Sequence, residues 1–192
     1  MKNLKNIKKT ILSNEWARLD RIDYDFQFKT GEWKPVSREC YNRGNGTGIL
    51  LYNVEKETVI LTRQFRMPSY ENNINDGMSI EVCAGAIDNN ESPLKTIIRE
   101  TEEEVGYRII TAQQVLTAYM SPGAITEKMY LFVAEYNSDM KINDGGGLES
   151  EEEEIEVLEL HFSEAIKMIE NEEIIDAKTI LLLQYAQINN LI

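Results

Sequence analysis

The chain has 192 residues, of which 42% are apolar, enough for the core of one domain with a small appendage. Its formal net charge of −13 argues against a broad basic surface, so we expect no nucleic-acid partner. No apolar stretch approaches the roughly 18 residues that span a bilayer, and the two cysteines do not make a disulfide framework, so we expect a cytoplasmic protein with no membrane partner.

The N-terminal residues 1–44 are predicted to form an antiparallel β-meander of two or three strands. Apolar side chains occupy every second position from Ile22 to Phe28, as in a half-buried strand, and a turn is expected at Lys29–Gly31. We therefore expect residues 1–44 to form one part of the protein and residues 45–192 to form the main domain.

From residue 48 onward, strands and helices are mixed. Strands are expected at 48–54, 58–65, 79–87, 111–120, 128–136 and 154–162, and helices at 93–105, 163–171 and 176–189. This order predicts an α/β fold with a mixed sheet and helices on both faces. The chain has a single histidine, His161, which is a poor basis for triad chemistry. Carboxylates, arginines and a metal ion are then left to carry any reaction.

A spaced set of glycines and charged residues begins near the end of the third expected strand and continues along the first expected helix. Its members are Gly85, Glu91, Arg99, Glu100, Glu103, Glu104 and Gly106. Ser92 and Pro93 are a typical helix start, and Gly106 a typical helix end.

The three later glutamates of this set, Glu100, Glu103 and Glu104, lie at positions i, i+3 and i+4, so their carboxylates share one helix face. Like charges this close repel one another, and in a partly buried cleft a cation is needed to neutralise them. Mg²⁺ suits a carboxylate site that is shared with phosphate oxygens. A solvated glutamate-rich helix is the alternative, but it does not account for the fixed glycines and arginine.

The complete spacing, G-x5-E-x7-R-E-U-x-E-E-x-G-U with U a bulky apolar residue, resembles the Nudix box, with Thr101 at one U position. Membership of the Nudix hydrolases implies an α/β/α sandwich with a mixed sheet, here with the N-terminal meander added. It implies metal ligation by Glu100 and Glu104, with Glu103 as an additional or alternative ligand. The resemblance also gives Arg99 the role of orienting the glutamates. A metal-binding backbone carbonyl falls to Ala84, and close approach to the substrate falls to Gly85 and Ala86.

Three further segments, 38–45, 61–66 and 119–127, resemble the nucleoside-diphosphate-sugar pyrophosphatases, and within them the GDP-mannose pyrophosphatase subgroup. This resemblance implies hydrolysis of GDP-mannose to GMP and mannose 1-phosphate with Mg²⁺, for which Mn²⁺ is a possible substitute. Two alternatives stay open. One is an ADP-ribose or broader nucleoside-diphosphate hydrolase, and the other is a Nudix-fold ligand-binding module without catalysis.

The subgroup resemblance also implies a set of substrate-binding residues outside the box. They are Trp16, Arg38, Glu39, Arg66, Glu127 and Lys178. For Trp16, stacking on the base and simple core packing are both open. In this branch the meanders of two protomers exchange, so the resemblance implies a homodimer in which Trp16, Arg38 and Glu39 reach the partner's substrate.

An acidic loop, 143–154, follows the last strand but one. The resemblance places a catalytic base, or an extra metal ligand, in this region, and Glu151 is the best match, with Glu149 and Glu152 as competitors. Three consecutive glycines, Gly145–Gly147, are expected to make the loop mobile. We therefore hypothesise that the loop closes over the substrate and brings Glu151 to the reacting water.

Overall fold

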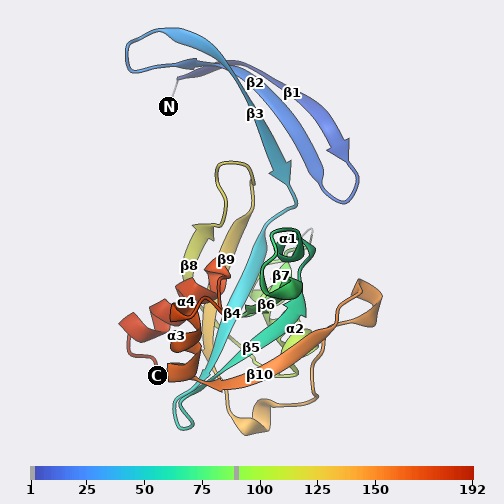
Figure 1. Cartoon of the computed structure of the whole chain (residues 1–192), viewed down its shortest axis with the longest axis vertical. Coiled ribbons are helices and arrows are strands. Elements are labelled where there is room, and N and C mark those ends of the chain that lie inside the picture. Colours follow the sequence, from blue (N-terminus) through green and yellow to red (C-terminus); the bar gives the residue numbers. More distant parts are fainter. Residues whose placement is uncertain (1–2, 89–90) are drawn as a thin grey trace. The chain divides into compact units, whose positions relative to one another are not determined.

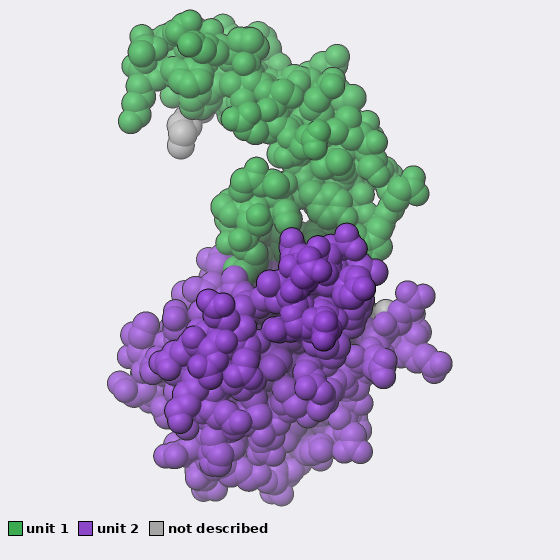
Figure 2. All heavy atoms as spheres, viewed as in Figure 1, with its two compact units in different colours: residues 1–45, 119–128 green, residues 46–118, 129–192 purple. Residues whose placement is uncertain are grey.

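Three antiparallel strands in the order β1-β2-β3 open the chain: β1 (Leu4–Asn14), β2 (Arg18–Gln27) and β3 (Trp33–Asn42) (Figure 1). The structure is a computed structural model, which describes residues 3–88 and 91–192, without the side chain of Glu151. Figure 2 shows the two compact units into which the chain divides, Met1–Asn45 with Tyr119–Lys128 and Gly46–Ala118 with Met129–Ile192.

The segment Tyr119–Lys128 belongs to the first unit through backbone hydrogen bonds at the end of β3. The Tyr41 N–H donates to the carbonyl of Ala124 at 2.8 Å, and the Thr126 N–H donates to the carbonyl of Tyr41 at 3.0 Å. Within β1, β2 and β3, no apolar side chain that the structure describes is buried; Ile7 and Ile11, for example, are 58% and 55% exposed. The three-stranded sheet thus has no apolar core of its own.

The second unit is built on a mixed sheet in the order β10-β5-β4-β9-β8, with β6 paired to β5 and β7 paired to β4. Its strands are β4 (Gly46–Asn53), β5 (Thr58–Phe65), β6 (Met78–Glu81), β7 (Cys83–Ala86), β8 (Gln113–Tyr119), β9 (Lys128–Glu135) and β10 (Ile155–His161). Its helices are α1 (Met67–Glu71), α2 (Pro93–Val105), α3 (Phe162–Glu170) and α4 (Ala177–Ile188). None of the helices in the described part of the chain is long and apolar enough to cross a membrane.

The central strand β4 is buried on both faces, as its continuous apolar sequence requires. Ile49, Leu50 and Leu51 are each at most 1% exposed. Successive side chains of a strand point to opposite faces. Ile49 and Leu51 belong to the core cluster that also contains Ile97 of α2, while α4 also contacts β4. The helices α2 and α4 lie on either side of β4 in Figure 1. The predicted mixed sheet with helices on both faces is confirmed.

The predicted strand 79–87 is in fact two strands that meet at Val82. Residues up to Glu81 pair with β5, whereas residues from Cys83 pair with β4. This change of partner is a consequence of tertiary pairing, so the apolar run in the sequence did not reveal it. It places the ends of β6 and β7 next to both of the polar clusters described below.

Candidate active site

Helix α2 begins and ends where the sequence predicts. The Ser92 hydroxyl accepts a hydrogen bond from the Lys95 N–H at 3.3 Å, Pro93 is the first helical residue, and Gly106 ends the helix in the left-handed conformation with φ of 74°. Thr101, at the position where an apolar residue is usual, is fully buried, and its hydroxyl donates to the Ile97 carbonyl at 2.6 Å. Its polar atom is therefore satisfied inside the helix.

The box carboxylates lie on one side of α2, and two of them are buried. Glu104 is 1% exposed and Glu100 is 7% exposed. Arg99 forms ion pairs with Glu100 and Glu103. Its Nη2 is 2.9 Å from Glu100 Oε1, and its Nη1 donates to Glu103 Oε2 at 2.6 Å. One guanidinium thus contacts Glu100 and Glu103 together, while Glu104 has no arginine among its described hydrogen-bond partners.

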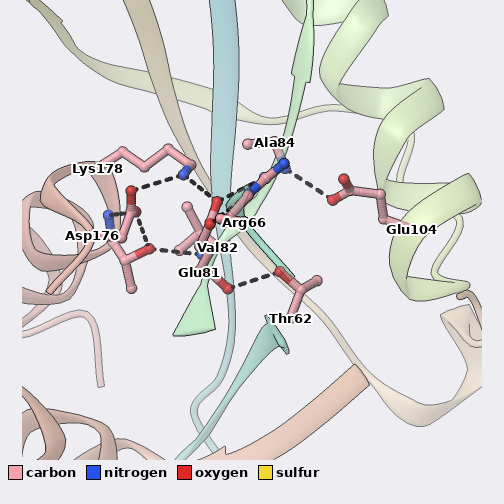
Figure 3. Close-up of polar contacts among 9 residues, drawn as sticks. Thr62, Arg66, Glu81, Val82, Ala84, Glu104, Asp176 and Lys178 are labelled. Atoms are coloured by element: carbon pink, nitrogen blue, oxygen red, sulfur yellow. Dashed lines mark hydrogen bonds and ion pairs between the residues drawn. The ribbon is translucent and has the colours of Figure 1, made fainter. Parts of the chain in front are cut away.

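Strand β7 brings its backbone directly against these carboxylates. The Ala84 N–H donates to Glu104 Oε2 at 3.0 Å (Figure 3). A Cβ atom at Gly85 would collide with the carboxylate of Glu100. A larger residue here would force the Glu100 carboxylate to move, and the backbone of Ala84 and Gly85 lies against the acidic face of α2.

Burial makes both inner carboxylates hard to ionise. It raises the pKa of Glu104 to about 8, although hydrogen bonds from Cys83 and Ala84 act in the opposite direction. It raises the pKa of Glu100 to about 7, with the Arg99 charge opposing and the Glu103 charge reinforcing the shift. Oxygen donors in a buried, acidic setting fit a hard divalent cation, which would replace the protons and neutralise the charge.

The described side chains do not by themselves make a ready three-ligand metal cage, since no group of three His, Cys, Asp or Glu residues is arranged for one. Glu100 and Glu104 supply two carboxylates. The remaining ligands predicted from the sequence are a backbone carbonyl, that of Ala84, and the side chain of Glu151, which lies outside the part of the structure that is described.

A second polar cluster joins two predicted substrate-binding residues, Arg66 and Lys178, through a residue that the sequence reasoning missed. The carboxylate of Glu81 accepts from Arg66 Nε at 2.9 Å and Nη2 at 3.0 Å, and from Lys178 Nζ at 2.6 Å (Figure 3). Asp176 is a further acceptor for Lys178 at 2.9 Å. A lone glutamate inside the apolar run 79–87 was the signal that could have revealed Glu81, because buried charges are normally paired.

Charge pairing determines how these groups titrate. Burial alone would raise the pKa of Glu81, but the Arg66 hydrogen bonds and the nearby charge of Lys178 hold its pKa well below the usual range. Burial alone would lower the pKa of Lys178, but the carboxylates of Glu81 and Asp176 raise it. The cluster therefore carries two cations and at least one permanent anion at neutral pH.

In the first unit, the structure brings Trp16 and Glu127 together around Arg43, which the sequence reasoning did not single out. The Arg43 guanidinium lies 5.3 Å from the centre of the Trp16 ring, and its Nε is 3.4 Å from Glu127 Oε1. Trp16 is 77% exposed, so it is not a core residue. Arg38 and Glu39 are exposed residues of β3, where Arg38 Nη1 donates to the Ser37 carbonyl at 2.7 Å.

The three glycines of the acidic loop hold it against the end of α2. The Gly146 N–H donates to the Glu104 carbonyl at 2.9 Å, and the Gly147 N–H donates to the Glu103 carbonyl at 3.2 Å. All three glycines have positive φ, of 68°, 114° and 80°. These φ values allow the loop backbone to cap the C-terminal end of α2. Farther along, the charge of Glu153 raises the pKa of both Glu100 and Glu104.

Comparison with known proteins gives matches over nearly the whole chain. A family profile described as the NUDIX domain matches residues 42–183, and one described as the GDP-mannose pyrophosphatase NudK N-terminal domain matches residues 3–41. The GDP-mannose pyrophosphatase of Yersinia enterocolitica serotype O:8 / biotype 1B is 48% identical over 98% of this chain and 97% of its own. That of Escherichia coli O157:H7 is 48% identical over 97% of this chain and 96% of its own.

A solved structure shares the fold at much lower sequence identity. It is titled "Crystal structure of ADP compounds hydrolase", superposes with a TM-score of 0.66 at 18% identity, and covers 96% of this chain and 97% of that chain. This likeness supports the architecture.

Proposed function

The chain belongs to the Nudix family, and from this premise we propose that it hydrolyses the diphosphate bond of GDP-mannose, releasing GMP and mannose 1-phosphate. One observation carries the proposal: the 48% identity to GDP-mannose pyrophosphatases runs through 98% of the chain, and residues 3–41 match the profile described as the GDP-mannose pyrophosphatase NudK N-terminal domain. The complete set of box glutamates supports catalysis over the binding-module alternative.

The phosphates would be held by the cations of the second cluster. Arginine binds phosphate oxygens through two parallel N–H groups, and lysine adds a compact positive charge. Arg66 and Lys178 both donate hydrogen bonds to the Glu81 carboxylate, so they are close enough to bind the same diphosphate. We propose that the backbone at Gly85 and Ala86 approaches the substrate closely beside the acidic face. In the first unit, we propose that the exposed Trp16 stacks on the base, with Arg38, Glu39 and Glu127 as further substrate contacts.

Nudix hydrolases generally use divalent metal ions, and we propose Mg²⁺, with Mn²⁺ able to substitute. Glu100, Glu104, the Ala84 carbonyl and Glu151 would hold the ion. When bound, such an ion neutralises phosphate charge and makes water more acidic. Arg99 keeps Glu100 and Glu103 oriented toward the same side of α2.

Within this proposal Glu151 takes the proton from the attacking water, with Glu149 and Glu152 as the alternatives. The matched pair E151Q and E104Q tests this assignment, since each replaces a carboxylate with an amide of the same size. We expect both variants to lose turnover. Full turnover in E151Q beside an inactive E104Q would show that Glu151 is not the base.

We further propose a homodimer that forms through the meander, residues 1–44, with residues 45–192 as the hydrolase domain. The exposed apolar side chains of β1 and β2 support a protein partner, because a three-stranded sheet without a core is marginal alone. Both described cysteines are free thiols, which supports a reducing, cytoplasmic location. Sedimentation of fully active protein as a 22.1 kDa monomer would contradict the dimer.

The function itself is tested by comparing hydrolysis of GDP-mannose, ADP-ribose and a nucleoside triphosphate with Mg²⁺, with E104Q as the control. We expect GMP to be released from GDP-mannose preferentially, and the activity to be lost in E104Q. Preference for ADP-ribose would overturn the choice of base and sugar. Inactivity on all three substrates would favour a binding module.

A further inference from the structure

Glu81 is buried at the end of β6 and has both candidate phosphate-binding cations as its partners. Its side chain is 5% exposed, and that of Lys178 is 11% exposed, whereas that of Arg66 is 42% exposed. Glu81 uses one edge of the guanidinium, formed by Nε and Nη2. Among the described residues Nη1 of Arg66 has no hydrogen bond, so the guanidinium is fixed on one side and available on the other.

The backbone around Glu81 is fixed to the backbone around Lys178. The neighbour of Glu81, Val82, donates its N–H to the hydroxyl of Thr179, the neighbour of Lys178, at 2.8 Å (Figure 3). The same hydroxyl donates to Asp176 Oδ2 at 2.6 Å, and Asp176 caps α4 by accepting from the Thr179 N–H at 2.9 Å. The carbonyl of Glu81 accepts from the Thr62 hydroxyl at 3.1 Å. Glu81 is thus held by β5, β6 and α4 together.

We propose that Glu81 is a positioning residue for catalysis: its carboxylate fixes the Arg66 guanidinium and the Lys178 ammonium in the single arrangement that receives the two phosphates of the substrate. This inference rests on the proposed function, because it assigns a diphosphate to those cations. Glu81 does not touch the substrate and acts only through Arg66 and Lys178.

A purely electrostatic role and a positioning role for Glu81 predict opposite changes in substrate binding when its carboxylate is removed. Removing the negative charge of Glu81 makes the cluster more positive, so electrostatic attraction alone would tighten the binding of an anionic substrate. If Glu81 positions the cations, its removal frees two long side chains to adopt many conformations, and binding weakens. The sign of the change in KM therefore separates the two roles.

The test is a comparison of E81Q with wild type in the hydrolysis of GDP-mannose, with thermal melts to establish that each variant is folded. We expect E81Q to raise KM and to lower kcat/KM by about 10²-fold, the scale of loss when a binding group is displaced by roughly 1 Å. The matched control is E102Q, because Glu102 makes the same two-pronged contact with Arg108, at 3.0 and 2.9 Å, on the exposed surface of the same unit. E102Q should leave kcat/KM unchanged.

A double-mutant cycle tests whether Glu81 acts through the cations. In an R66A K178A background, E81Q should cause little further loss of kcat/KM, because the groups that it positions are already gone. An equal loss in both backgrounds, or an unchanged or lowered KM in folded E81Q, would overturn the role. Should E81Q not fold, E81D keeps the negative charge but shortens the side chain by one methylene, so it can no longer reach both cations as Glu81 does. It should raise KM in wild type and cause little further loss in the R66A K178A background, and a folded E81D protein with unchanged KM would overturn the role.

The two proposals fail in different ways. A wild-type protein that does not release GMP from GDP-mannose overturns the proposed function. An active wild type whose E81Q variant binds substrate as well as before overturns only the positioning role of Glu81.

Discussion

At Glu104, folding buries a carboxyl group whose ionised form is unfavourable in that environment. This carboxyl group is almost completely inaccessible to water, the Cys83 thiol and the Ala84 N–H hydrogen-bond to it, and the charge of Glu100 opposes its ionisation. A carboxyl in such a place is stable when protonated or when a cation is beside it. The chemistry that suits the site and the stability of the fold therefore both depend on what neutralises this group.

We predict that the metal-free protein loses stability as the pH rises. The pKa of Glu104 in the folded protein, about 8, lies above its ordinary value of 4.5, and that of Glu100, about 7, lies above the same value. The contribution of these protonated carboxyls is complete below pH 4.5 and is lost as the pH rises through 7 and 8. Thermal melts in a chelator between pH 5 and about 9 would measure it.

The variant E104Q is the control for this pH dependence, because its amide stays neutral and can still accept from the Ala84 N–H. It should lose less stability between pH 6 and 8 than wild type, and Mg²⁺ should stabilise wild type most at the upper end of that range. Parallel melting curves for wild type and E104Q across the whole range would contradict the assignment of the shift to Glu104.

At the scale of elements, α4 is hydrogen-bonded to the sheet at Val82, where the pairing changes from β6 with β5 to β7 with β4. Val82 lies between β6 and β7, and its N–H is satisfied by the side chain of Thr179. We predict that T179V lowers the free energy of unfolding by about 1–3 kcal/mol, because it leaves a buried N–H without an acceptor. T179S, which keeps the hydroxyl, should lose much less. Urea unfolding would compare them, and equal losses would point to packing as the cause.

A second element-scale prediction concerns the glycine cap on α2. Gly146 has φ of 114°, a conformation that other residues rarely adopt, and its N–H is bonded to the Glu104 carbonyl. We expect G146A to lower the free energy of unfolding by about 1–3 kcal/mol. The control is G123A, since a Cβ at Gly123 meets nothing within 4 Å and the backbone there is not left-handed. Thermal melts in which the two variants behave alike would argue against the cap.

At the scale of the whole molecule, exchange of the meanders predicts complementation between two inactive variants. R38A alters the meander and keeps the box, whereas E104Q alters the box and keeps the meander. If each meander serves the partner's site, mixed dimers contain one intact site of two. With random mixing, half of the dimers are mixed, so activity should recover to about a quarter of the wild-type value.

This recovery is measured by refolding the two variants together and assaying GDP-mannose hydrolysis, with each variant refolded alone as the control. Mixtures that stay as inactive as the separate variants would mean that each meander serves its own chain, or that no dimer forms.

Local patterns in the sequence predicted most of the fold and the acidic half of the site. The helix from Pro93 to Val105, its cap at Ser92 and its end at Gly106 depend on neighbouring residues, so sequence spacing predicts them. The other half depends on contacts between distant segments. Val82 and Thr179 are separated by 97 positions, as are Glu81 and Lys178, and no local pattern encodes such pairs. The role of Glu81 therefore became visible only in three dimensions.

Val82 lies outside the strand pairing, between β6 and β7, and its amide therefore reports on the attachment of α4. The Val82 N–H is protected from solvent by a side chain of α4, whereas the N–H groups within the neighbouring strands are protected by the sheet. Deuterium should therefore reach this amide whenever α4 detaches, long before the sheet opens. Two residues farther along the chain, in β7, the Ala84 amide reports on Glu104 in the same way. A single peptide spanning these positions would follow both halves of the site by mass spectrometry, without any substrate present.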